Sequence, residues 1–220
     1  MSNPLLERFE LPPFSRIKPE HVKPAIEQII AENKAAVQMR LEKGGPYTWD
    51  NLIAPLEFMD DRLNRSWSPV SHLNAVMNSE ALRDAYNGCL PLLSEYATEF
   101  GQNEKLYAAY LELAESAEFE DLDQAQKKIV KNALRDFRLS GVSLPSAKKD
   151  RFKALAQELS KLSSQFQDNV LDATQAWQRH IEDASVLNGI PESARAMAAE
   201  TARAQGLSGW VFNLEFPSYI

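Results

Sequence analysis

The chain has 220 residues, of which 44% are hydrophobic and 25% are charged, as expected for a globular protein that can build its own core. Its 24 basic and 31 acidic residues give a net charge of −7, which argues against a protein that binds nucleic acid by neutralising phosphates. No stretch approaches the roughly 18 apolar residues that cross a bilayer, and residues 1–30 lack the pattern of a secretory signal. We therefore expect a soluble, cytoplasmic protein with no nucleic-acid and no membrane partner.

The chain has only eight glycines and many good helix formers, which indicates helices joined by short connections. Apolar residues three or four positions apart predict a first helix over residues 20–43, closed by Gly44. Thr48 is predicted to cap a second helix. Within that helix, Pro69 should break or kink the chain, and Ser68 should cap the continuation.

Three further helices are predicted in the middle of the chain. Ser79 begins one that ends at Gly101, and residues 103–116 form a shorter one. Asp121 and Gln124, three positions apart, predict a capping box at the start of the third.

The longest predicted helix begins near Ser146 and runs to about residue 174. Its apolar residues recur almost as a repeat of three and four, which suits a helical hairpin or a coiled-coil-like seam. These residues, named the α-stripe here, are Phe152, Leu155, Leu159, Leu162, Phe166 and Val170.

The last 45 residues have a different pattern. Residues 177–181 alternate weakly as a strand, residues 191–204 predict a helix ended by Gly206, and residues 210–216 alternate strongly as a strand. One interpretation pairs the two strands in a small ribbon. The interpretation that we favour is that the second strand belongs to a longer protein, whose further residues supply a neighbour and a cover. The apolar residues on one face of that strand are Trp210, Phe212, Leu214 and Phe216.

Together these elements predict a mainly α protein. We expect about six helices, packed as antiparallel hairpins or a bundle, with a small β-ribbon near the C-terminal end. Residues 1–175 are expected to form an N-terminal helical domain, and residues 176–220 to begin a small α/β segment.

The three histidines are the first candidates for metal ligands, but their surroundings do not match a zinc motif. A zinc peptidase helix carries H-E-x-x-H, which places two imidazoles and a glutamate on one face. Val, Leu and Ile follow the histidines where that glutamate would stand. We therefore assign no metal to His21, His72 or His180. We expect His21 in a first helical turn and the other two half-exposed or hydrogen-bonded.

A Nucleophilic catalysis also needs an orienting acid and an oxyanion hole, and no G-x-S-x-G turn is present. Ser68 is therefore expected to be a helix cap. Cys89 lies on the apolar face of its helix, where a free cysteine behaves as a small hydrophobic residue.

The acidic residues also carry no metal or catalytic assignment. The run 118–123 lacks the glycine of a calcium-binding loop, and its charges fit a helix N-terminus. Asp60 and Asp61 are adjacent and so point in different directions on a helix. No catalytic, cofactor-binding or metal-ligating residue is assigned in the chain.

Short strings spread along the chain carry a family resemblance, among them SPVSHLN at residues 68–74, LPLLSEY at residues 90–96 and NALRDF at residues 132–137. Their order along the chain makes the match specific although each is short. The chain resembles the N-terminal portion of the oligopeptidase A family, which belongs with the thimet oligopeptidase-like zinc peptidases. Further matching strings lie at residues 3–6, 11–14, 125–128, 139–141, 169–174 and 216–219, with Trp177.

The resemblance implies a zinc metallopeptidase that cleaves short peptides in a deep channel between two mostly helical halves. Family chains continue well past residue 220, and their H-E-x-x-H helix, third zinc ligand and transition-state-stabilising residues lie in that later part. Zinc would therefore belong to the full-length enzyme, and none would be bound by this chain.

This portion would form a channel wall that acts as a size filter. Its partners would be short peptide substrates and the remainder of the same polypeptide. The alternative is a free-standing helical interaction module, which would need the α-stripe to be an exposed docking face.

Overall fold

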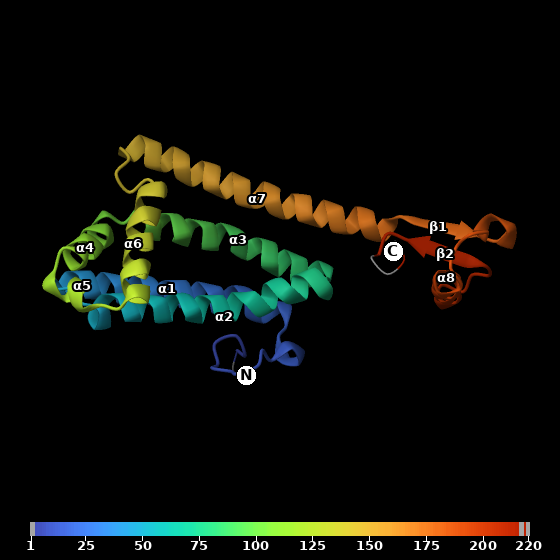
Figure 1. Ribbon diagram of the computed structural model, residues 1–220, viewed down its shortest axis with the longest axis horizontal. Coiled ribbons are helices and arrows are strands. Elements are labelled where there is room, and N and C mark those ends of the chain that lie inside the picture. The colour runs from blue at the N-terminus through green and yellow to red at the C-terminus, as the bar shows by residue number, and fades with distance from the viewer. Residues whose placement is uncertain (1–2, 216–217, 219–220) are drawn as a thin grey trace. The chain divides into compact units, whose positions relative to one another are not determined.

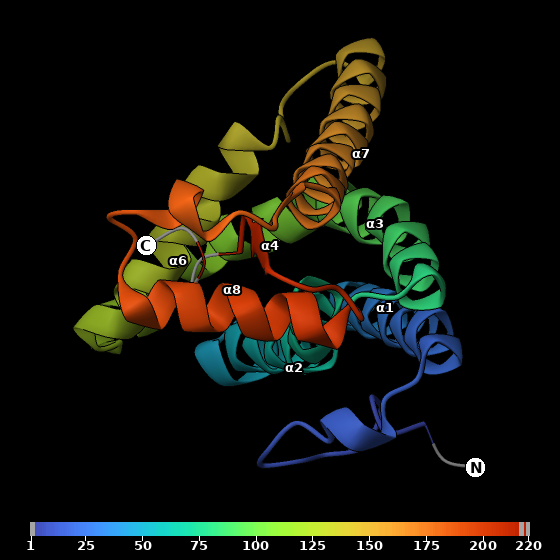
Figure 2. The same ribbon diagram turned by 90° about the vertical axis from the view of Figure 1, so that its right-hand side faces the viewer.

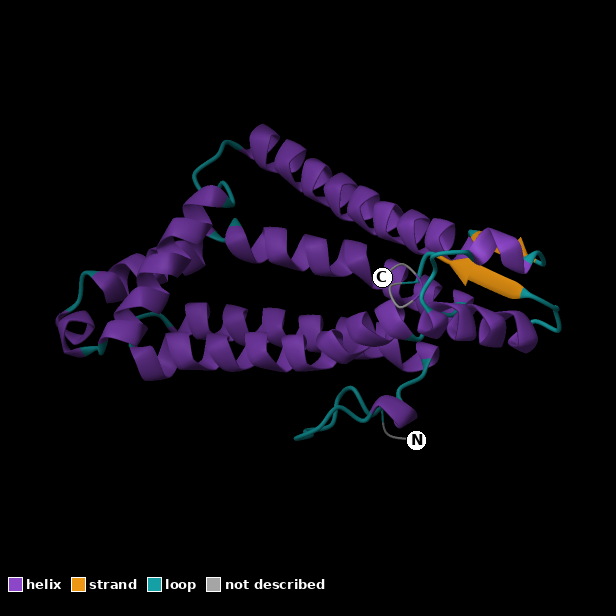
Figure 3. Cartoon of the chain, turned by 45° about the vertical axis from the view of Figure 1, so that its right-hand side comes forward, coloured by secondary structure: helices purple, strands orange, loops and turns teal. Residues whose placement is uncertain are grey.

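The computed structural model describes residues 3–215 and residue 218. Within them the chain forms eight α-helices and a sheet of two strands, and Figure 3 shows how far helix predominates. The predicted mainly α class with a small ribbon is confirmed. The helices are α1 Pro19–Lys43, α2 Ala54–Val76, α3 Glu80–Gly101, α4 Glu104–Ala114, α5 Ala117–Asp121, α6 Gln124–Leu139, α7 Ser146–Ala176 and α8 Glu192–Ala204, and the strands are β1 Gln178–Ile181 and β2 Trp210–Asn213.

The chain divides into two compact units, residues 1–161 and residues 162–220. In the first unit, α1 packs against both α2 and α3, and Figures 1 and 2 show the three helices side by side from two directions. The N-terminal segment joins their core through Leu5, whose carbonyl oxygen accepts a 2.6 Å hydrogen bond from the Ser66 hydroxyl. The buried residues of this core are Leu5, Val22, Ala25, Ile26, Ile30, Val70, Leu73, Leu82 and Cys89.

A second core of the same unit lies where α4, α5 and α6 meet parts of α1 and α2. α6 packs against α4, and Figure 1 shows it running across the direction of α1, α2 and α3. The ring of Phe137 on α6 contacts the rings of Phe100, Tyr107 and Tyr110 at centroid distances of 6.1, 5.7 and 5.3 Å. The buried residues are Val37, Leu52, Ile53, Leu56, Leu106, Ala109, Tyr110, Leu113, Phe119, Val130, Leu134, Phe137 and Val142.

Side-chain caps begin the middle helices where the sequence predicts them. The Thr48 hydroxyl accepts a hydrogen bond from the N–H of Asn51, ahead of a π-helical segment, Trp49–Ile53, that leads into α2. Ser79 caps α3 and Asn103 caps α4 in the same way. Each cap satisfies an amide that the helix itself leaves without a partner.

Two predictions about helix ends are wrong. α2 continues through Pro69, so Ser68 caps no new helix. Proline removes one backbone hydrogen bond, but Pro69 is buried together with Val70 and Leu73, so that packing outweighs the lost bond. The capping box is formed two residues later than predicted, because an unpredicted short helix, α5, extends to Asp121.

In the observed capping box, the Asp123 carboxylate accepts a 2.8 Å hydrogen bond from the N–H of Gln126. The Gln126 side-chain oxygen in turn accepts a 2.9 Å bond from the N–H of Asp123. This reciprocal pair begins α6.

The predicted seam on α7 is also wrong. Five α-stripe residues, Leu155, Leu159, Leu162, Phe166 and Val170, are between 47% and 69% exposed. A heptad-like repeat becomes a seam only when another helix covers it, and within the described residues the stripe is not covered. α7 instead contacts α3 and α4 through charged groups, since Lys153 pairs with Glu95 and Lys149 with Glu104, both at 2.5 Å.

In the second unit, β1 and β2 pair antiparallel, with Gln178 opposite Asn213 and Ile181 opposite Trp210. The ribbon interpretation is thus confirmed. β2 is shorter than predicted: it ends at Asn213, whose side-chain oxygen accepts a hydrogen bond from the N–H of Glu215 and turns the chain. Phe216 lies outside the described residues.

α8 packs against β2, and the buried residue of that strand is Val211. Alternate residues of a strand point to opposite faces, so the predicted aromatic face of Trp210 and Phe212 is the half-buried one.

Candidate functional site

The structure does not bring the histidines together. His21 lies in the first turn of α1, where its Nδ1 accepts a 3.1 Å hydrogen bond from the N–H of Lys18. His72 is exposed on α2, with its ring 5.4 Å from that of Phe14, and His180 lies on β1, 2.6 Å from the Ser208 carbonyl oxygen. Among residues 3–215 and 218, no three His, Cys, Asp or Glu side chains form a group that could hold a metal ion. The described residues therefore do not fit the zinc that the resemblance implies, and we route no chemical step through it.

The other sequence candidates have structural roles. Cys89 is fully buried, and burial raises the pKa of its thiol to about 11, as expected of a hydrophobic residue and not of a nucleophile. In the acidic run, Asp123 caps α6, and Glu118 accepts a hydrogen bond from the N–H of Trp49. Asp60 and Asp61 face different neighbours, since Asn64 donates to the first and Arg65 pairs with the second.

A groove of about 690 Å³ lies between α2, α3, α4 and α6, and we name it the aromatic groove. Its volume is in the range of sites that bind small molecules. Five of its side chains are aromatic, and they come from all four helices. Its lining residues are Leu56, Glu57, Met59, Asp60, Leu63, Asn64, Trp67, Leu93, Tyr96, Ala97, Phe100, Gly101, Tyr110, Ala133, Asp136, Phe137 and Ser140.

The charged groups that line the aromatic groove are all carboxylates. Glu57 and Asp60 come from α2, one helical turn apart, and Asp136 comes from α6. Burial and the charge of Asp60 raise the pKa of Glu57. Burial also raises the pKa of Tyr110, and the nearby charge of Glu57 adds to that rise. The groove offers apolar rings beside negative charge, an arrangement suited to binding.

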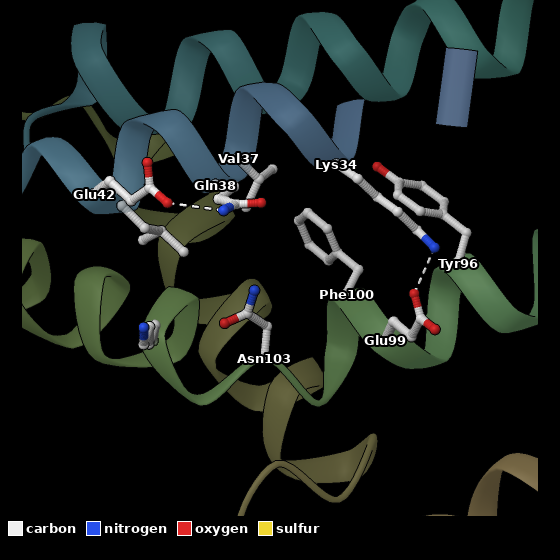
Figure 4. Close-up of a pocket in the computed structure, with 10 residues that line it drawn as sticks. Lys34, Val37, Gln38, Glu42, Tyr96, Glu99, Phe100 and Asn103 are labelled. Atoms are coloured by element: carbon white, nitrogen blue, oxygen red, sulfur yellow. Dashed lines mark hydrogen bonds and ion pairs between the residues drawn. The ribbon is translucent and has the colours of Figure 1, made fainter. Parts of the chain in front are cut away.

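A smaller hollow of about 370 Å³ lies between α1 and the α3–α4 region (Figure 4). Figure 4 shows the rings of Tyr96 and Phe100 pointing from α3 toward α1; both residues also line the aromatic groove. Lys34 reaches Glu99 at 2.6 Å, and a hydrogen bond from Lys34 lowers the pKa of that carboxyl. Positive and negative groups are thus balanced in this hollow, in contrast to the aromatic groove.

Sequence analysis placed the aromatic groove residues only on buried helix faces. A usable signal was nevertheless present, because Glu57 and Asp60 flank the apolar positions Leu56 and Met59 on α2. Two carboxylates at the edge of an apolar stripe mark a boundary where a binding surface can form. Which rings face them depends on α3, α4 and α6, whose placement is tertiary.

Comparison with known proteins gives the family. Residues 26–149, more than half of the chain, match the family model described as the N-terminal domain of neurolysin and thimet oligopeptidase. The chain belongs to this family. The resemblance predicted from the sequence is thus confirmed.

The whole chain matches proteins named oligopeptidase A. It is 53% identical to that of Haemophilus influenzae and 50% identical to that of Escherichia coli, in each case over 220 residues. It is also 34% identical over 226 residues to a probable cytosolic oligopeptidase A of Arabidopsis thaliana. In all three comparisons the chain covers 32% of the relative's length, so it spans about a third of the proteins that it matches. None of its described helices is long and apolar enough to cross a membrane.

Proposed function

We propose that the chain is the N-terminal portion of an oligopeptidase A-type peptidase that hydrolyses short peptides with a zinc ion. The observation that carries this proposal is the identity of 50–53% to two proteins named oligopeptidase A, over every residue of the chain. In this proposal the catalytic and zinc-binding residues lie in the remaining polypeptide, the substrates are short peptides, and the enzyme is cytoplasmic.

We further propose that residues 1–175 form one wall of the peptide channel and act as a size filter. The dimensions support this role: α1 has 25 residues and is about 37 Å long at 1.5 Å per residue, and α2 and α3 are nearly as long. Because the three helices share one buried core, they form a stiff surface instead of separate rods. Residues 176–220 would begin a small α/β segment that the remaining polypeptide completes.

The first test is to read the coding sequence beyond codon 220, where an H-E-x-x-H motif is expected. The longer protein should cleave an internally quenched peptide and lose this activity to a chelator, whereas purified 1–220 should contain no stoichiometric zinc and cleave nothing. A zinc ion in each 1–220 chain, with chelator-sensitive cleavage, would show that the histidines have been misassigned. The size filter predicts that the longer protein cleaves short peptides and leaves folded proteins intact.

One observation favours the second candidate, a helical interaction module. The α-stripe is exposed, as such a module requires, and five large apolar side chains on one helix are an uncommon surface for an isolated domain. A coding sequence that lacks a downstream zinc motif would decide for the module. The downstream motif would make the α-stripe a contact surface for the remaining polypeptide.

A further inference from the structure

The aromatic groove is an ordered apolar surface and not a gap between flexible side chains. Its rings form a continuous chain of contacts: Tyr96 lies 6.2 Å from Phe100, Phe100 lies 6.1 Å from Phe137, and Phe137 lies 5.3 Å from Tyr110. Phe137 and Tyr110 are buried in the second core, so the inner end of this chain is fixed by packing. Tyr96, Phe100 and Trp67 are only partly buried and remain available to a ligand.

The groove carries negative charge that the protein itself does not neutralise. Of its three carboxylates, Asp136 pairs with Arg135 at 2.8 Å. Asp60 accepts a 2.9 Å hydrogen bond from the neutral amide of Asn64. Within the described part of the chain, no cation pairs with Glu57 or Asp60, and none of the groove's lining residues is Lys, Arg or His.

These features fit a ligand that is both cationic and apolar. A guanidinium or ammonium group gains from carboxylates and from the faces of aromatic rings at once, and the partly buried setting strengthens both attractions. The raised pKa of Glu57 agrees with a negative pair in want of a positive partner. An anionic ligand would meet repulsion, and a purely apolar one would leave the two carboxylates uncompensated.

We propose that the aromatic groove binds short peptides in which a lysine or arginine follows an aromatic or large aliphatic residue. The cation would lie between Glu57 and Asp60, and the apolar side chain would lie against Tyr96, Phe100 and Trp67. That the ligand is a peptide rests on the proposed function; its charge and polarity rest on the groove.

The test is a calorimetric titration of the 220-residue chain with acetyl-phenylalanyl-arginine amide, whose capped ends leave the guanidinium as its one charge. Two analogues dissect the binding: citrulline in place of arginine removes the charge, and glycine in place of phenylalanine removes the ring. We expect each analogue to bind about fivefold more weakly than the parent peptide or worse.

The matching protein variant is Glu57→Gln/Asp60→Asn, which removes two charges with little change in volume. Its control is Glu112→Gln/Glu115→Gln, which removes two exposed carboxylates, three positions apart, from outside the groove. The groove variant should bind the parent peptide about fivefold more weakly, and the control variant within about twofold of the original chain. Amide NMR shifts on binding should concentrate in α2 and α3.

The proposal is overturned if the parent peptide does not bind at millimolar concentration, or if the citrulline analogue binds equally well. Equal losses in the groove and control variants would also overturn it, because they would show attraction by net charge alone. These outcomes are separate from the proposed function. Peptide cleavage by the longer protein without binding by the groove refutes only this inference, and binding without any cleavage refutes only the peptidase.

Discussion

The exposure of the α-stripe can be tested by two leucine-to-alanine changes that differ only in their surroundings. Leu106 on α4 is 0% exposed and Leu159 on α7 is 67% exposed. A fully buried Leu→Ala change costs about 2.7–5.0 kcal/mol, because it loses transfer free energy and leaves a cavity. We therefore expect Leu106→Ala to lower the free energy of unfolding by about 3 kcal/mol.

The expected cost at Leu159 is much smaller. The change removes three carbon atoms, worth about 2.4 kcal/mol when fully buried, and only a third of that surface is out of water. Alanine is also the slightly better helix former, so the net loss should be about 0.5 kcal/mol. Urea unfolding followed by helical circular dichroism measures both values on the same chain.

Ile26→Val, a smaller change in the first core, should cost about 0.5–1.5 kcal/mol and remains measurable if Leu106→Ala prevents folding. A loss above about 2 kcal/mol for Leu159→Ala would refute the exposed stripe. If that loss grows with protein concentration, the stripe is buried between copies of the chain.

Three further predictions concern single features. Ser66→Ala leaves the buried carbonyl of Leu5 without its hydrogen bond and should cost about 1–3 kcal/mol, measured by urea unfolding, while Ser68→Ala at an exposed site should change little. The Cys89 thiol, with its pKa raised from 9.0 to about 11, should resist a disulfide reagent at pH 8 until the chain is unfolded. The unfolded thiol loses its proton first, so this group makes stability fall as pH rises from about 9 to 11, and a Cys89→Ala chain should lack that component. β2 should exchange its amide hydrogens faster than α1 to α3, because its four residues pair with one short strand; strong protection in a dilute monomer would contradict this.

Local signals explain which parts of the fold were predictable. A cap such as Ser79 or Asn103 needs only a side-chain oxygen and an amide three residues later, so the sequence alone places it. The capping box was displaced because two acid–glutamine pairs compete in the same stretch. Only the formation of α5 selects Asp123 over Asp121.

Properties that depend on several elements could not be read from the sequence. A helix stripe has the same pattern whether a neighbour covers it or not, so periodicity cannot distinguish the exposed α7 from the buried α1. The aromatic groove joins residues about eighty positions apart, from Leu56 to Ser140, and its existence depends on how α6 crosses α2 and α3. Pro69 shows the same limit, since packing keeps its helix intact.

The aromatic groove and the second core share residues, and this sharing decides how the site can be studied. Phe137, Tyr110 and Leu56 line the groove and are also buried in the core, so replacing them would lower stability and binding together. Glu57 and Asp60 are exposed at the edge of the same groove and belong to neither core. Surface charge changes of this kind usually alter stability by less than about 0.5 kcal/mol. A binding defect in the Glu57→Gln/Asp60→Asn chain, with its unfolding midpoint unchanged, would therefore report on the ligand site and not on the fold.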